Sequence, residues 1–213
     1  MLDLKTLQQG AIAFGLNLSD EQLRSCDALL RELNDWNQRI NLTAIRDPEQ
    51  QLVKHLLDSF SVQPYLSGNR IADVGTGAGF PGLPLALVNP DRQFTLIDSI
   101  NKKLRFVQHA AEVMKLSNVS VLHTRAEQYK PEALFDCIVS RALSSVENFT
   151  SWCGHLCAPG GKLLAMKGKF PEEELKSLPK QWKVVAVHTL HIPGLEEQRH
   201  LVELSRTSPG AKA

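Results

Sequence analysis

The first sixty or so residues carry apolar positions that recur every three or four residues, which is the spacing of one helix face. One stripe follows the helix-capping pair Ser19 and Gln22, and a second follows Asp47 as N-cap and Pro48 in the first helical turn. The first stripe consists of Leu23, Cys26, Leu30, Leu33 and Trp36, and the second of Leu52, Val53, Leu56, Leu57 and Phe60. This spacing predicts a helical extension over residues 1–66.

From Arg70 onward the pattern changes to short apolar runs that alternate with helical patterns. The predicted strands span residues 70–75, 93–98, 118–123, 135–140, 162–167, 183–190 and 200–205, and the predicted helices span 81–88, 101–116 and about 145–157. Such alternation implies a parallel sheet with crossover helices. The last two strands flank HIPGLEEQR and predict an antiparallel hairpin. We therefore expect a single α/β unit over residues 67–213, on which the helical extension packs.

Length and composition limit this picture without deciding it. A chain of 213 residues with 43% hydrophobic content can bury one sizeable core and an extension. The net charge of +1 gives no basic field, so a nucleic-acid partner would need a local patch. The four cysteines form no CxxC pair, and no apolar run approaches the roughly 20 residues that span a bilayer. We expect a cytoplasmic monomer that does not enter membranes.

The stretch RIADVGTGAGFPGLPLAL places alternating glycines between a strand and a helix. Glycines there permit positive φ and let a ligand approach the backbone. The segment from Gly77 to Gly82 fits the dinucleotide pattern G-x-G-x-x-G, with Asp98 about twenty residues further on. The other register reads D-x-G-x-G-x-G from Asp73 to Gly79, which is the loop signature of S-adenosylmethionine-dependent methyltransferases.

Two further features favour the methyltransferase register. LCAPGGKLLAMKG (Leu156–Gly168) places Pro-Gly-Gly between a helix and a strand, as at the entry to the fifth strand of that class. The final hairpin adds an antiparallel strand where a dinucleotide enzyme continues with a second parallel half. Asp98 does not discriminate, because a carboxylate at the end of the second strand can accept ribose hydroxyls in either class. An NAD(P)-dependent oxidoreductase and a noncatalytic module that senses nucleotide or methyl donor remain alternatives.

Seven segments occur together and in order between Asp35 and Leu204: DWNQRINLTAIRD, LVKHLLDS, DVGTGAGFPGLPLA, LIDSINKKLRF, VISRAL, MKGK and RHLVEL. They resemble the RsmG (glucose-inhibited division protein B) family of ribosomal RNA methyltransferases. Two positions depart from many members, since Ala78 and Phe80 stand where proline and leucine are usual. The resemblance implies a Rossmann-like class I S-adenosylmethionine-dependent methyltransferase fold.

The resemblance also implies transfer of a methyl group from S-adenosylmethionine to N7 of guanine 527 in 16S ribosomal RNA of the small subunit. Methylation of exocyclic amino groups generally uses an Asp/Asn-Pro-Pro-aromatic tetrad after the fourth strand, where this chain reads SRAL (Ser140–Leu143). Carbon methylation of pyrimidines needs a cysteine, typically in a Pro-Cys pair, which the chain lacks. Guanine N7 carries an in-plane lone pair, so its methylation needs no dedicated base.

The resemblance and its fold assign site residues to the carboxyl ends of the strands. The candidate cofactor-binding residues are Gly75, Gly77, Gly79, Phe80, Asp98, Ala126, Glu127 and Arg141. Arg141 is also the candidate catalytic residue, because an arginine just past the fourth strand can contact donor or RNA. Structural alternatives stay open: the glycines form only a tight turn, Asp98 only caps a helix, Ala126 and Glu127 lie in a solvated loop, or Arg141 forms a surface ion pair.

Other polar residues allow less specific predictions. His55 and Asp58, three residues apart on one helix face, are expected to lie within hydrogen-bond reach of each other, in a structural or an RNA-facing role. Cys153 and Cys157 flank His155, but two thiols without further ligands predict core packing and no metal. Nine basic residues are candidates to rim the ligand crevice and contact RNA phosphates: Arg39, Arg46, Lys54, Lys102, Lys103, Arg105, Lys162, Lys167 and Lys169.

Overall fold

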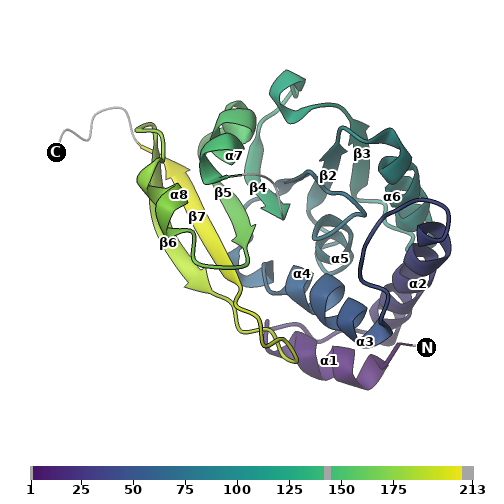
Figure 1. The fold of residues 1–213 in the computed structure, drawn as a ribbon. Coiled ribbons are helices and arrows are strands. Elements are labelled where there is room, and N and C mark those ends of the chain that lie inside the picture. Colours follow the sequence, from purple (N-terminus) through teal and green to yellow (C-terminus); the bar gives the residue numbers. More distant parts are fainter. Residues whose placement is uncertain (1, 142–144, 208–213) are drawn as a thin grey trace.

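The computed structural model describes residues 2–141 and 145–207 (Figure 1). Its strands form one seven-stranded sheet in the order β3-β2-β1-β4-β5-β7-β6. They are β1 (Arg70–Val74), β2 (Gln93–Asp98), β3 (Val119–His123), β4 (Phe135–Arg141), β5 (Cys157–Lys167), β6 (Trp182–Thr189) and β7 (His200–Arg206). β7 runs antiparallel to β5 and β6, and the other neighbouring pairs are parallel. The predicted mostly parallel sheet with a C-terminal antiparallel hairpin is confirmed.

Helices lie on both faces of this sheet (Figure 1). The longer ones are α1 (Leu4–Ile12), α2 (Asp20–Asn37), α5 (Gly82–Leu87), α6 (Asn101–Val113), α7 (Val146–Cys153) and α8 (Glu172–Lys176). Between α2 and β1 lie α3 (Pro48–Gln51), the π-helical segment η1 (Leu52–Leu57), α4 (Asp58–Phe60) and the 3-10 turn η2 (Gln63–Tyr65). Two further 3-10 turns are η3 (Ala126–Gln128) and η4 (Gly154–Leu156).

Alternating side chains of the central strands enter two separate apolar clusters, as the pleat of a strand requires. Ile71 and Leu164 belong to one cluster, which also holds buried residues of α1, α2, α5 and α6. Ala72 and Leu163 belong to the other, which α7 covers. The helical extension therefore shares its core with one face of the sheet. The division at residue 66 remains a prediction, because one cluster runs across it.

The helix starts predicted in the extension form as expected. The Ser19 side chain accepts a hydrogen bond from the Gln22 backbone N–H, and the Gln22 side chain accepts one from the Ser19 N–H. The Asp47 carboxylate likewise accepts from the Gln50 N–H at 2.8 Å. These contacts satisfy backbone donors that have no partner inside the helix. The sequence did not predict that the second helix becomes π-helical in η1.

Several predicted boundaries are wrong by a few residues. The first strand ends at Val74, because Gly75 already has a positive φ of 71°. Helix α6 ends at Val113 and the chain leaves it through Lys115, which has a φ of 55°. Strand β5 starts at Cys157, so the Pro-Gly-Gly segment lies inside the strand and not before it. α8 had no sequence prediction, since its five residues contain too few apolar positions to show a period.

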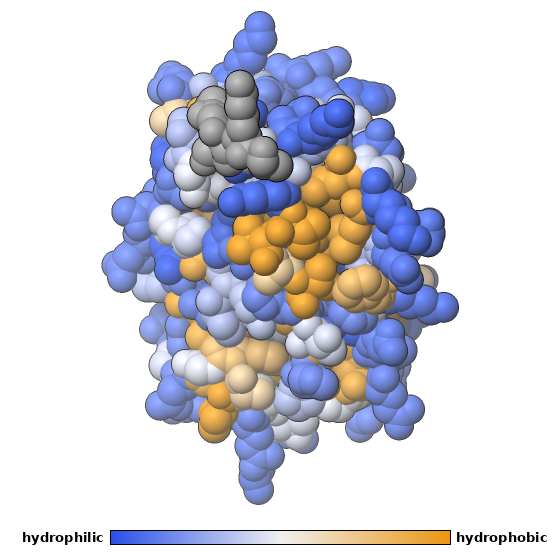
Figure 2. All heavy atoms as spheres, turned by 90° about the vertical axis from the view of Figure 1, so that its left-hand side faces the viewer, coloured by the Kyte–Doolittle hydropathy of each residue, from blue (hydrophilic) through white to orange (hydrophobic). Residues whose placement is uncertain are grey.

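Apolar atoms gather on the face that carries β6 and α8 (Figure 2). β6 is the last strand in the sheet order, so its outer edge has no strand partner among residues 2–141 and 145–207. Val185 in β6 and Phe170 ahead of α8 are both about half exposed.

Across the described chain, every helix is too short or too polar to cross a membrane.

Candidate functional site

The loop between β1 and α5 has the left-handed backbone that the alternating glycines suggested. Gly75, Gly77 and Gly79 have φ values of 71°, 59° and 83°. At Gly79 a side chain would also collide, because an added Cβ would lie 2.4 Å from Cδ1 of Leu83. At Gly77 the nearest atom to an added Cβ is the Gly75 carbonyl oxygen at 3.9 Å, so one side of the loop is open. The glycines thus form a tight turn and also leave backbone accessible to a ligand.

A buried carboxylate fixes the shape of this loop. Asp73 lies in β1 with no exposed surface, and its Oδ2 accepts hydrogen bonds from Thr76 Oγ1 at 2.7 Å and from the Gly82 N–H at 2.8 Å. Its other oxygen, Oδ1, has no hydrogen-bond partner in the described part of the chain. Burial raises the pKa of Asp73 to about 6, against the opposing effect of the two hydrogen bonds. The acidic position of the methyltransferase signature therefore connects the strand, the turn and the helix.

Asp98 ends β2 beside the same loop. Its Oδ2 accepts from the Gly77 N–H at 2.9 Å, and its Oδ1 accepts from the Ile100 N–H at 2.8 Å, just ahead of α6. Asp98 thus supports the turn and the chain just ahead of α6, although its side chain caps none of the N–H groups of that helix. The same side chain also lines a pocket, so the two roles do not compete.

This pocket has a volume of about 350 Å³ and lies where β1, β2 and β3 end. It is lined by Val74, Gly75, Ile97, Asp98, Ser99, Thr124, Arg125, Ala126, Glu127 and Trp152. Four of the predicted cofactor-binding residues, Gly75, Asp98, Ala126 and Glu127, therefore meet in one cavity. A carboxylate, exposed backbone and an aromatic side chain suit the ribose and adenine of a nucleoside.

Sequence reasoning missed the pocket residue Trp152. It belongs to α7 and is partly exposed. The helix itself was expected over residues 145–157, but its apolar spacing does not show which side chain reaches past the sheet edge. Thr124 and Arg125 were also missed, although they directly precede the predicted Ala126 and Glu127.

The other predicted residues, Gly77, Gly79, Phe80 and Arg141, do not line this cavity. Arg141 ends β4, where its Nη1 donates to the Lys54 carbonyl at 2.9 Å and to Asp58 Oδ2 at 3.1 Å. Its guanidinium carbon lies 5.5 Å from the centre of the Phe80 ring. The structural alternative of an ion pair is therefore realised, but at a largely buried carboxylate next to the glycine loop rather than at the surface.

His55 lies on the same side of the loop. Its ring stacks on Phe80 with centroids 4.6 Å apart, and its Nε2 is within hydrogen-bond distance of Thr43 Oγ1, at 3.0 Å. Burial and the nearby Arg141 lower the pKa of His55 to about 3, so the ring is neutral near pH 7. The expected hydrogen bond between His55 and Asp58 is not present, because Asp58 pairs with Arg141 and Arg199.

The remaining candidates from the sequence are two cysteines, a lysine of β5 and the segment at the end of β4. Cys153 and Cys157 are buried among apolar side chains, and no three His, Cys, Asp or Glu residues of the described chain are placed to hold a metal ion. Lys162 does not rim the crevice. It lies beside Cys137, which lies beside Ile71 near the start of β1, whereas the crevice is where the strands end. Its side chain forms an ion pair with Glu203. Of the SRAL segment (Ser140–Leu143), the last two residues lie outside the described residues.

Strand order and the glycine loop together define the class of protein. The order β3-β2-β1-β4-β5-β7-β6 with an antiparallel β7 is that of class I S-adenosylmethionine-dependent methyltransferases, whereas dinucleotide-binding folds continue with a parallel sixth strand. The fold is similar to a methyltransferase from Thiobacillus denitrificans in complex with S-adenosyl-L-homocysteine, with 15% identity, a TM-score of 0.55 and coverage of 81% of this chain and 98% of that one. TrmN from Thermus thermophilus gives 19% identity, a TM-score of 0.57 and coverage of 77% and 55%.

The family model for GidB, rRNA small subunit methyltransferase G, matches residues 22–202. Ribosomal RNA small subunit methyltransferase G of Aeromonas salmonicida is 47% identical over 195 residues, covering 92% of this chain and 94% of the relative. The protein of that name from Escherichia coli is 44% identical over 188 residues, covering 88% and 91%. The chain belongs to this methyltransferase family. The resemblance inferred from the seven ordered segments is confirmed, and the oxidoreductase register is not the one the fold uses.

Proposed function

We propose that this protein transfers a methyl group from S-adenosylmethionine to N7 of guanine 527 in the 16S ribosomal RNA of the small subunit. The observation that supports it best is the pocket where β1, β2 and β3 end, because Gly75, Asp98, Ala126 and Glu127 meet there. Membership of the small-subunit methyltransferase family gives the acceptor class. The particular base and atom follow from the resemblance and from the chemistry of N7.

The residues present fit the methyl donor. The Asp98 carboxylate borders the cavity and can accept from ribose hydroxyls, and the segment Ala126–Glu127 can meet an adenine. The atom nearest to a Cβ added at Gly77 would be the Gly75 carbonyl oxygen, 3.9 Å away, so a ligand has room against this part of the loop. When bound, S-adenosylmethionine supplies a methyl group on a positively charged sulfur. Trp152 would add an aromatic surface to the wall of the cavity.

The chain then has to supply orientation rather than proton transfer. Guanine N7 has a lone pair in the ring plane, so no base is needed to free it. Holding two reactants in line can lower the activation free energy by about 7 to 11 kcal/mol. The basic groups near the end of β4 suit this task, because Arg141 is fixed by two acceptors beside the glycine loop. We therefore assign Arg141 as the residue that contacts donor or acceptor during transfer.

Mapping the methylated base in ribosomal RNA tests this proposal directly. Ribosomal RNA from cells with and without the gene is mapped for 7-methylguanine by chemical cleavage at that base and by mass spectrometry of the fragments. We expect guanine 527 to carry the methyl group only when the gene is present. A methyl group on an exocyclic amine or on another nucleotide would contradict the assignment.

We infer that the acceptor is 16S RNA within the small subunit, that the protein acts in the cytoplasm where subunits form, and that it acts as a monomer. Purified protein incubated with naked 16S RNA, with small-subunit particles and with whole ribosomes distinguishes the acceptors by incorporated methyl label. Sedimentation equilibrium of the same protein measures its oligomeric state.

A further inference from the structure

Asp58 holds a position that the reaction outlined above does not use. It lies in α4 of the helical extension with its side chain 4% exposed, and it joins two arginines that come from other parts of the chain. Its Oδ2 is 3.1 Å from Arg141 Nη1 at the end of β4, and its Oδ1 is 3.3 Å from Arg199 Nε, next to the start of β7. Extension, central strand and C-terminal hairpin therefore meet at one carboxylate.

The same helical segment fixes Arg141 a second time. The Lys54 carbonyl of η1 accepts from Arg141 Nη1 at 2.9 Å, four residues before Asp58. Two acceptors on consecutive helical segments, Lys54 in η1 and Asp58 in α4, determine the direction of the guanidinium. Its central carbon lies 5.5 Å from the centre of the Phe80 ring. π-helical segments occur often at functional sites, where they change the direction of helix groups.

Stability alone is a poor reason for this arrangement. Burying a carboxylate and two guanidinium groups carries a desolvation cost that can exceed their mutual attraction, and well-packed apolar residues often serve as well or better. We therefore interpret the buried carboxylate between two guanidinium groups as fixing their geometry. Arg141 and Arg199 each remain 23% exposed, so both reach the outside from this anchor.

We propose that Asp58 is a positioning residue for methyl transfer, acting through Arg141. Its carboxylate holds the Arg141 guanidinium at the glycine loop, and Arg199 forms an ion pair with its second oxygen without a hydrogen bond, which brings the hairpin to the same point. This inference rests on the proposed role of Arg141 in transfer. It explains why a helical extension outside the sheet takes part in the site at all.

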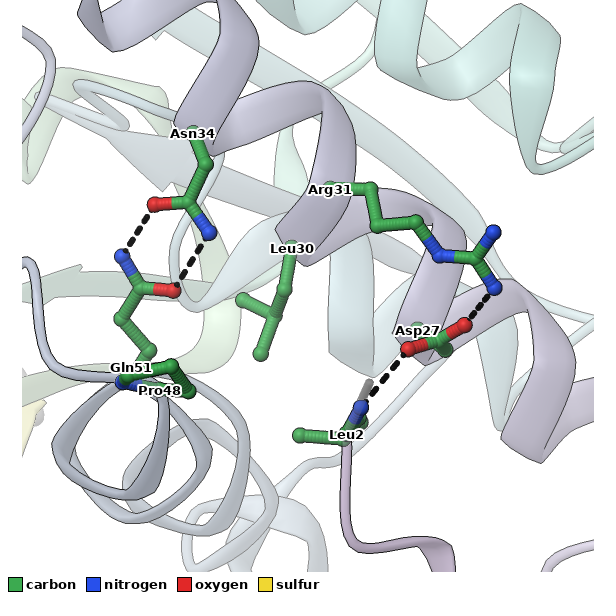
Figure 3. Close-up of a pocket in the computed structure, with 7 residues that line it drawn as sticks. All are labelled: Leu2, Asp27, Leu30, Arg31, Asn34, Pro48 and Gln51. Carbon is green, nitrogen blue, oxygen red and sulfur yellow. Dashed lines mark hydrogen bonds and ion pairs between the residues drawn. The ribbon is translucent and has the colours of Figure 1, made fainter.

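The test compares single-turnover methyl transfer to small-subunit particles at saturating enzyme and donor. Asp58→Asn keeps the shape of the side chain and removes its charge, and we expect a fall of about 10- to 100-fold, since a misplacement of about 1 Å can cost about 100-fold. Asp58→Glu keeps the charge and should recover part of the rate. The matched control is Asp27→Asn, because Asp27 is also a buried carboxylate of the extension, paired with Arg31 and accepting from the Leu2 N–H (Figure 3). That variant should lose stability and keep the transfer rate.

A double-mutant cycle shows whether Asp58 acts through Arg141. In an Arg141→Ala background, Asp58→Asn should change the rate less than about twofold, because the group that it positions is gone. An additive loss, or a wild-type rate for Asp58→Asn beside an impaired Arg141→Ala, would overturn the inference. A wild-type rate for Arg141→Ala would instead refute the role of Arg141 itself. If thermal melting shows that Asp58→Asn does not fold, Arg199→Gln takes its place in the double-mutant cycle, because it removes a charged partner of the same carboxylate.

Discussion

The two sides of the loop after β1 are built in different ways. On one side, most of the residues that line the pocket lie at or just after the ends of three adjacent parallel strands, and they include two carboxylates, Asp98 and Glu127. On the other side, the Phe80 ring stacks on His55 of the helical extension and lies under the guanidinium of Arg141 from β4, which pairs with Asp58. We call the second group the Phe80 cluster. The pocket suits binding of a ligand, whereas the Phe80 cluster suits control of orientation and charge.

This difference predicts separable defects. Changes in the pocket should weaken donor binding, and changes in the Phe80 cluster should slow transfer. The buried groups Asp73 and His55 should affect the pH dependence of stability in opposite directions. The two sides share one structural element, the turn from Gly75 to Gly79, and a change there has the largest expected effect.

Gly77→Val should abolish most donor binding while the sheet stays folded. Gly77 has a φ of 59°, which costs a residue with a side chain about 1 to 2 kcal/mol, and the added methyl groups would fill the open space beside the loop. We expect affinity for S-adenosylmethionine, measured by calorimetry, to fall about 100-fold or more, or about 3 kcal/mol. Gly15→Val is the control, because Gly15 has a φ of 76° with no atom within 4 Å and lies in the extension. Equal donor binding by both variants would show that the loop does not contact the donor.

Asp73→Asn should change the pH dependence of stability at the turn that the two sides share. The folded pKa of Asp73 is raised to about 6 from 3.8, so the folded protein binds more protons than the unfolded chain between these values. Its contribution to the free energy of unfolding therefore falls as pH rises from about 4 to about 6, by about 3 kcal/mol in total. Urea denaturation of wild type and variant at several pH values measures the difference between them. Parallel curves would contradict a protonated Asp73.

Asp98→Ala should weaken donor binding by about 1.5 to 3 kcal/mol, the usual contribution of a hydrogen bond to a charged group. The change also removes the acceptors for the Gly77 and Ile100 N–H groups, so the loop loses part of its support. Asp91→Ala is a suitable control, because Asp91 is exposed in the turn before β2, at the opposite edge of the sheet. Calorimetry with a folded Asp98→Ala protein of unchanged affinity would defeat the ribose assignment.

His55→Gln should show the opposite pH behaviour on the side of the Phe80 cluster. The folded pKa of His55 is lowered to about 3 from 6.5, so the unfolded chain binds more protons between these values. The stability that His55 contributes is present above pH 6.5 and is lost as pH falls, by about 2 kcal/mol between pH 6.5 and pH 5. The stability difference between wild type and His55→Gln should therefore grow from pH 5 to pH 6.5. A constant difference would mean that the ring is protonated in the folded protein.

The same contrast explains how far the sequence could predict the molecule. Parallel strands end at a common edge, so Asp98, Ala126 and Glu127 could be placed together once the strands were recognised. The neighbours of Arg141 could not, because they depend on how η1 packs against β4 and on where the hairpin returns Arg199. Helix spacing put His55 and Asp58 on one face, but each of them found a partner in another element.

The smallest expected effects concern RNA phosphates. Lys102 follows the end of β2 and Lys169 follows the end of β5, so both lie toward the edge of the sheet that holds the pocket, and both are exposed. Each Lys→Ala change should weaken RNA binding by less than about 1 kcal/mol and reduce the slope of log affinity against log salt by about 0.7 to 0.9. Donor affinity should stay unchanged, because the pocket lining contains neither lysine.

Lys183→Ala is the matched control for these two changes. Lys183 is exposed in β6. It lies opposite Ser205 of β7, and Ser205 in turn lies opposite Lys162 of β5. Lys183 is therefore toward the end of the sheet away from the pocket. Filter binding of 16S RNA at several salt concentrations should separate it from Lys102 and Lys169, because counterions are released only where a lysine meets a phosphate. If all three variants changed the slope equally, the contact would be spread over the whole surface. The RNA would then not be oriented by the edge on which the pocket and the Phe80 cluster meet.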